Sequence, residues 1–237
     1  MIHTVRLSDV PAQPWRNGGG STCELLVWPA SGASAGASAG ASGGASGGVS
    51  GGASSGPSDG PSTAPWQCRI SVARIEQNGP FSPFPGVERW FAVVQGEGVV
   101  LRFANRRALL SVGSQPLRFE GASAPQCALL DGATQDLNLM GQSAAGRAGM
   151  FMVTPGEDWD SSAKLRAVYT ACAASLEVDG EPALSLPAHT LAYSEQAAHQ
   201  RWRLTPSPSP SPQALASALD STRTPGAWWM QFKPRTT

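Results

Sequence analysis

Short apolar runs separated by glycine-containing turns are the feature that most restricts how this chain can fold. Residues 90–94 and 99–103 are two such runs, and Gln95-Gly96-Glu97-Gly98 joins them through glycines that permit the positive φ angles of a hairpin turn. Residues 68–75 alternate apolar and more polar side chains, which is the two-residue period of a half-buried strand. Many short strands at this spacing predict an all-β sandwich or barrel.

The same pattern extends along most of the chain. Further strand-like stretches are expected at residues 22–28, 129–130, 137–140, 165–173, 175–178 and 184–191. Turns are expected at Asn78-Gly79, Asp131-Gly132 and Asp179-Gly180. The stretches after residue 165 repeat the style of the earlier ones more weakly, so the second half of the chain is also expected to consist of strands.

Two low-complexity segments divide the chain. Residues 30–64 are almost entirely Gly, Ala and Ser, cannot bury enough apolar area to offset their ordering entropy, and are therefore expected to form a disordered insertion. Residues 206–212 alternate Pro and Ser and should be extended and unpaired. We therefore expect an N-terminal half at 1–150, a second half at 151–205, and a linker and tail at 206–237.

Charge and composition exclude several classes of partner. Seventeen basic residues balance seventeen acidic ones, so no net field attracts nucleic acid or an anionic membrane. The sequence contains neither a run of about 20 apolar residues nor a signal-peptide pattern at its start. The four cysteines are isolated from one another, as expected for free thiols in a reducing compartment. The sequence thus predicts a cytoplasmic protein that binds neither nucleic acid nor membrane.

The segment before the hairpin turn carries the most informative motif. Its apolar strand running into Gly-Glu-Gly resembles the first motif of cupins, in which a metal is held by a His-x-His pair and by a Glu that six residues separate from the turn glycine. Here the corresponding residues are Ser82, Phe84 and Arg89. Serine and phenylalanine are poor ligands for a divalent cation, and an arginine would repel one. We therefore expect no metal and no other cofactor.

Arg89 itself has two interpretations. A guanidinium that points into an apolar barrel would be a specific receptor for a carboxylate, because its planar fork of donors matches the two carboxylate oxygens. The alternative is an outward-facing Arg89 paired with Glu88 or another nearby acid. The sequence leaves both open.

Two other segments could contribute to a site. The Gly18-Gly19-Gly20 run after Trp15 could form an anion-binding nest of backbone N–H groups, or simply a tight turn that places Trp15 in the core. Asp136 and Asn138 share one face of an expected strand, where they could bind a ligand or transfer protons, or cap a turn.

Taken together, the ordered blocks resemble the HutD/Ves family. The blocks are Trp15-Arg16-Asn17-Gly18-Gly19-Gly20 with Thr22 and Glu24, Arg69-Ile70-Ser71-Val72-Ala73, Gly79-Pro80-Phe81-Ser82 with Phe84-Pro85-Gly86 and Arg89, and Asp131-Gly132 with Asp136-Leu137-Asn138. The resemblance implies a bicupin, usually encoded with histidine-utilisation genes, with an accessory or regulatory role. On this resemblance the candidate ligand-binding residues are Trp15, Asn17, Arg69, Ser82, Phe84, Arg89 and Asp136.

Three functions are compatible with these features. The leading hypothesis is a non-enzymatic protein that senses a carboxylate metabolite of histidine degradation: urocanate, a formylated or formimino glutamate, or formate. A rival is a metal-independent isomerase or hydrolase with Asp136 or Glu24 as general base. A third is a protein-interaction module that uses Trp228 and Trp229 of the tail. A homodimer is left open.

Overall fold

The computed structural model describes residues 1–29, 66–196, 199–207 and 226–235. The expected insertion at 30–64, most of the Pro/Ser stretch and the region up to residue 225 lie outside these ranges. Within the described ranges the regular structure is β-strand, apart from the short 3₁₀ helices η1 (Leu7–Asp9) and η2 (Gly121–Ser123). The expectation of an all-β protein is confirmed.

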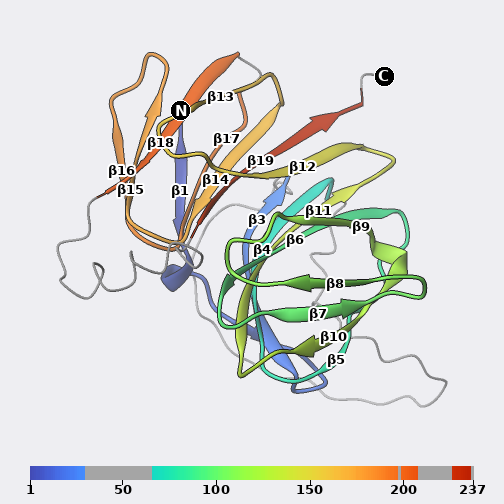
Figure 1. Ribbon diagram of the computed structural model, residues 1–237. Coiled ribbons are helices and arrows are strands. Elements are labelled where there is room, and N and C mark those ends of the chain that lie inside the picture. The colour runs from blue at the N-terminus through green and yellow to red at the C-terminus, as the bar shows by residue number, and fades with distance from the viewer. Residues whose placement is uncertain (30–65, 197–198, 208–225, 236–237) are drawn as a thin grey trace, which may run out of the picture.

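The first half of the chain forms a module of two antiparallel sheets (Figure 1). The larger sheet, in spatial order, consists of β2 (Gln13–Pro14), β3 (Gly20–Trp28), β4 (Cys68–Ile75), β11 (Thr134–Gln142), β6 (Val87–Gln95) and β9 (Leu117–Glu120). The smaller sheet consists of β5 (Gly79–Pro80), β10 (Gln126–Leu129), β7 (Val99–Arg102) and β8 (Arg107–Leu110).

A second module also has two antiparallel sheets. One consists, in spatial order, of β1 (His3–Arg6), β17 (Thr190–Ser194), β14 (Leu165–Thr170), β19 (Ala227–Pro234) and β12 (Gly146–Met152). The other consists of β13 (Asp158–Ser161), β18 (Gln200–Pro206), β15 (Ala174–Val178) and β16 (Leu184–Leu186).

The two modules repeat one strand topology. The order β4-β11-β6-β9 in the first module becomes β12-β19-β14-β17 in the second, and β5-β10-β7-β8 becomes β13-β18-β15-β16. The chain therefore traces the same path twice, as expected for a bicupin. The two sheets of a module are separate hydrogen-bonded units that face each other, so each module is a cupin-like sandwich rather than one closed ring of strands.

Three hydrophobic cores separate four layers of sheet. One core lies between the sheets of the first module and includes Phe91 and Leu101, and a second fills the second module around Trp202. The third and largest lies between the modules, where Ile70 of β4 and Phe232 of β19 belong to one cluster. The larger sheets are therefore buried on both faces, and β4, expected to be half-buried, has seven of its eight residues buried.

The C-terminal strand corrects the interpretation of residues 206–237 as a linker and tail. Residues 227–234 form β19, which pairs with β14 on one side and β12 on the other. Trp228 is fully buried and Trp229 is 3% exposed, one in each of two cores. The two tryptophans are therefore not a surface for partner recognition. The N-terminal strand β1 also departs from the expected division at residue 150, because it pairs with β17 and so belongs to the second module.

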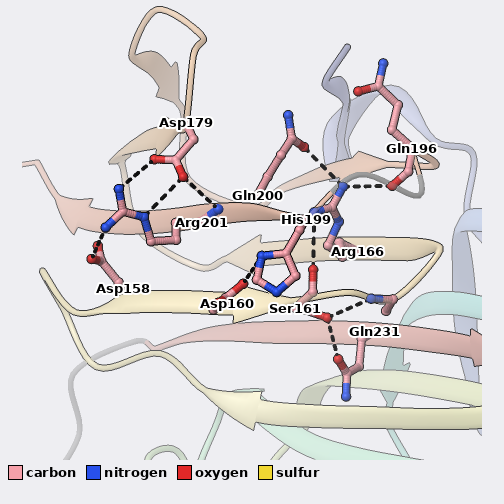
Figure 2. A network of polar contacts seen from close by, with 11 residues as sticks. Asp158, Asp160, Ser161, Arg166, Asp179, Gln196, His199, Gln200, Arg201 and Gln231 are labelled. Atoms are coloured by element: carbon pink, nitrogen blue, oxygen red, sulfur yellow. Dashed lines mark hydrogen bonds and ion pairs between the residues drawn. The ribbon is translucent and has the colours of Figure 1, made fainter.

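The interior of the second module is occupied by aromatic rings and one arginine. Trp159 stacks on Trp229 with ring centroids 4.9 Å apart, and Trp202 meets both edge-on. Figure 2 shows fully buried Arg166 of β14 donating to Ser161 O at 3.3 Å, Gln196 O at 2.8 Å and Gln200 Oε1 at 3.1 Å. These contacts tie β14 to the end of β13, to the start of β18 and to the connection between β17 and β18.

The Gly-Glu-Gly turn between β6 and β7 requires its glycines. Gly96 and Gly98 have φ angles of 97° and 121°, and a Cβ at Gly98 would overlap the carbonyl oxygen of Leu110. We expect Gly98→Ala to reduce the free energy of unfolding by roughly 2–3 kcal/mol, from backbone strain plus this clash. Gly180→Ala is the control, with positive φ but open space around the added methyl, and should cost about 1 kcal/mol. Urea unfolding measures both, and equal losses would contradict the steric argument.

Candidate functional site

The inward face of the larger sheet of the first module carries the candidate site. Ser71 of β4, Asn138 of β11 and Phe91 of β6 are opposite one another in one row across three strands. Arg69, Met140 and Arg89 form the next row. A cavity of about 60 Å³ lies against this face and is lined by Trp15, Thr22, Ser71, Ala73, Ile75, Pro80, Phe81, Ser82, Phe84, Arg89, Phe91, Asn138 and Met140. We call it the inner cavity.

Arg89 points into the inner cavity. Its side chain follows the alternation of β6, in which Arg89 and Phe91 face inward while Glu88 and Trp90 face the opposite side. The residue is only 8% exposed. The interpretation of Arg89 as an outward-facing partner of Glu88 is therefore wrong: Glu88 instead accepts hydrogen bonds from Arg118 and from Trp90 Nε1.

Aromatic rings surround the Arg89 guanidinium. Its Cζ lies 5.0 Å from the ring centroid of Phe81, 5.6 Å from that of Phe84 and 5.3 Å from that of Phe119. Arg89 Nη2 also donates to Asn138 Oδ1 at 3.1 Å. Rings within about 6 Å of a cation stabilise it through the negative faces of their π systems. The guanidinium of Arg89 therefore lines the cavity among aromatic rings.

Arg69 is held differently, although it was expected to act with Arg89. Its Nη2 forms an ion pair with the carboxylate of Glu24, and its Cζ lies 5.5 Å from the ring centroid of Trp66. Arg69 is 7% exposed and does not line the inner cavity. Glu24 therefore supplies a counter-charge to Arg69, whereas Arg69 Nε is buried without a hydrogen-bond partner among the described residues.

Asp136 lies one inward position beyond Asn138 on β11 and has no exposed surface. Thr134 Oγ1 donates to its Oδ2 at 2.7 Å, while Oδ1 has no hydrogen-bond partner among the described residues. Burial raises the pKa of Asp136 to about 8. The carboxyl is therefore mainly protonated at neutral pH, and it does not line the inner cavity. With no exposed surface and no part in the lining, the Asp136 carboxyl is not placed to take a proton from a ligand in that cavity.

The N-terminal turn supplies one wall. Trp15 Nε1 donates to Thr22 Oγ1 at 2.8 Å, which fixes the indole against the inner cavity. Asn17 Oδ1 accepts from Gly19 N at 3.0 Å, so that N–H is not available to a backbone anion nest. Asn17 lines a neighbouring cavity rather than the inner one.

Of the expected site residues, the inner cavity brings together Trp15, Ser82, Phe84 and Arg89. The sequence reasoning did not single out Phe81, Ser71 or Thr22 as lining residues. A signal was present for Ser71, which shares a strand face with Arg69. Phe81 lies in the connection between β5 and β6, where no periodicity indicates the direction of a side chain.

The described ranges contain neither a metal-binding cluster nor a membrane-spanning helix. No group of three or more His, Cys, Asp and Glu side chains there is arranged to hold a metal ion. Nor does that part of the chain contain a helix long and apolar enough to cross a membrane.

The doubled topology defines a cupin-like protein of two modules. Solved structures agree with this fold: the YlbA protein from E. coli has a TM-score of 0.58 and 8% identity, covering 100% of this chain and 92% of that one. The HutD family model matches residues 55–208, and the chain belongs to the HutD family. The expected HutD/Ves membership is confirmed.

Two relatives and two further structures are similar to the chain. It is 29% identical over 139 residues to an uncharacterized 21.2 kDa protein in the hutC 3′ region of Pseudomonas putida, and 30% identical over 135 residues to protein Ves of Citrobacter koseri. These matches cover 59% and 56% of this chain, and 57% and 54% of the two relatives, so the chain spans little more than half their length.

The two structures cover all of both chains. HutD from Pseudomonas fluorescens SBW25 has a TM-score of 0.69 and 23% identity, and a conserved protein of unknown function from Pseudomonas aeruginosa PAO1 has a TM-score of 0.71 and 24% identity. At these identities the likeness establishes the fold.

Proposed function

We propose that this protein is a non-enzymatic accessory or regulatory component of histidine utilisation that binds a small carboxylate metabolite in the inner cavity. The observation that carries the proposal is Arg89, nine-tenths buried and lining a cavity among three phenylalanine rings. Membership of the HutD family supports the association with histidine utilisation.

The chemistry of the cavity favours a carboxylate. A buried guanidinium is stabilised by charge-assisted hydrogen bonds to an anion, and its planar fork matches the two carboxylate oxygens. Apolar surroundings strengthen such a contact because little water competes for the donors. Asn138, already bonded to Arg89, would orient the guanidinium for the ligand.

The size of the inner cavity limits what it can hold. Its volume of about 60 Å³ exceeds the roughly 10–15 Å³ that one buried water requires, so it has room for several waters or for the carboxylate end of a small ligand. Formate would fit entirely. Larger candidates, such as urocanate or a formylated glutamate, would place only the carboxylate there. The name of one similar structure, HutD from P. fluorescens, specifies a formate condition.

Thermal unfolding in the presence of candidate ligands tests the proposal. A ligand that binds only the native state at about 100 times its Kd stabilises that state by about 2.7 kcal/mol, which should raise the melting temperature by roughly 5–10 °C. We expect this shift with at least one of formate, urocanate and N-formylglutamate, and none with matched concentrations of chloride. Unchanged melting with all carboxylates at concentrations up to about 50 mM, where even a Kd near 1 mM gives a measurable shift, would contradict the proposal.

A further inference from the structure

A second cavity adjoins the inner one in the first module. It has a volume of about 210 Å³ and is lined by Trp15, Asn17, Gly19, Ile75, Gln77, Asn78, Gly79, Pro80, Phe81 and Cys127. Four of these residues, Trp15, Ile75, Pro80 and Phe81, also line the inner cavity and form the wall between the two. We call this space the vestibule.

The orientation of two amides in the vestibule is fixed by backbone donors. Asn17 Oδ1 accepts from Gly19 N at 3.0 Å, and Asn78 Oδ1 accepts from Leu129 N at 2.8 Å. An N–H group requires an acceptor, so the oxygen of each amide must face the backbone and the NH₂ group must face away from it. Both side chains are exposed, and within the described residues neither Nδ2 donates to a protein acceptor.

These orientations give the vestibule a chemical preference. Two NH₂ donors on different connections, one before β3 and one before β5, suit a group that accepts hydrogen bonds. The inner cavity, at about 60 Å³, is smaller than the vestibule, at about 210 Å³, so a ligand too long for the inner cavity would extend towards the vestibule. Trp15 and Phe81 border both spaces and would flank a ligand that occupies both.

We infer that the first module recognises a two-ended ligand, with one carboxylate at Arg89 and a second acceptor group, such as another carboxylate, at the amides of Asn17 and Asn78. This inference rests on the proposed binding of a carboxylate in the inner cavity. It adds a subsite that selects the length and the far end of the ligand.

Asparagine-to-aspartate variants test the subsite with little structural change. Asn17→Asp and Asn78→Asp each keep the oxygen that accepts the backbone N–H, but replace the donor with a negatively charged acceptor. The control is Asn105→Asp, an equally small change in the exposed turn between β7 and β8, which borders neither cavity. Melting temperatures within about 2 °C of wild type would establish that all three variants fold.

Calorimetric titration with acetate and glutarate separates the two ends. We expect wild type to bind glutarate at least about tenfold more tightly than acetate, corresponding to about 1.4 kcal/mol. The Asn17→Asp and Asn78→Asp variants should each weaken glutarate binding by about tenfold while acetate binding stays within about threefold. Asn105→Asp should change neither.

Two results would overturn the inference alone: equal affinities of wild type for acetate and glutarate, or equal losses for both ligands in the vestibule variants. In either case the carboxylate site at Arg89 would stand without the second subsite. If neither acetate nor glutarate binds at all, the proposed function fails and the inference fails with it.

Discussion

Replacing Arg89 with leucine is expected to abolish carboxylate binding while the protein remains folded. Loss of a charge-assisted, bidentate contact costs about 2–5 kcal/mol, or a factor of roughly 30 to several thousand in Kd. The fold should survive because leucine would be surrounded by Phe81, Phe84 and Phe119, and replacing a buried charge with an apolar side chain is often neutral or stabilising.

Calorimetric titration of formate or acetate measures the effect. Arg107→Leu is a matched control, because it removes the same charge from an exposed position on β8 of the same module. This control should bind the ligand with an affinity within about threefold of wild type. A normal affinity for Arg89→Leu would show that Arg89 does not bind the carboxylate, and Arg69, which already carries a counter-charge from Glu24 and does not line the inner cavity, would be a weaker candidate.

The second large effect concerns Asp136. Burial raises its pKa to about 8, whereas an unfolded chain has an aspartate pKa near 4. The folded state therefore holds a proton that the unfolded state releases. The resulting stabilisation is complete below about pH 4 and is lost at about 1.4 kcal/mol per pH unit as the pH rises towards 8.

Asp136→Asn should remove this pH dependence. An amide occupies nearly the same volume and never ionises, so the variant should be more stable than wild type by up to about 4 kcal/mol at pH 7 and nearly equal to it at pH 4. Urea unfolding at pH 4, 5.5 and 7 measures the difference. A variant that is less stable than wild type at pH 7, with no dependence on pH, would indicate that the carboxylate is ionised and needed in the native protein.

The repeated strand pattern predicted most of the fold. It failed where a strand is buried on both faces and where strands far apart in the sequence pair. Residues 227–234 read Ala-Trp-Trp-Met-Gln-Phe-Lys-Pro and lack the alternation of a half-buried strand, because Trp228 and Trp229 face two different cores. β4 also packs against a core on each face, so more of its residues are buried than the alternation of apolar and polar side chains predicted. β1 pairs with β17 although the paired residues, such as Arg6 and Thr190, are far apart in the sequence, and no local pattern indicates such a pairing.

The site was predictable where it depended on strand register. Six residues separate Arg89 from the turn glycine Gly96, and the inward direction that this spacing favours is the one that the structure shows. The partner of Arg69 was not predictable, because Glu24 lies on β3, far from β4 in the sequence, and no local pattern gives the register in which the two strands pair.

A crystal structure with acetate bound at saturating concentration tests the central claim most directly, because it shows whether a carboxylate occupies the inner cavity. The account predicts acetate in or beside the inner cavity, with the carboxylate oxygens about 2.7–2.9 Å from the guanidinium nitrogens of Arg89. Acetate found only elsewhere on the protein, with the inner cavity occupied by water at saturating ligand, would contradict it.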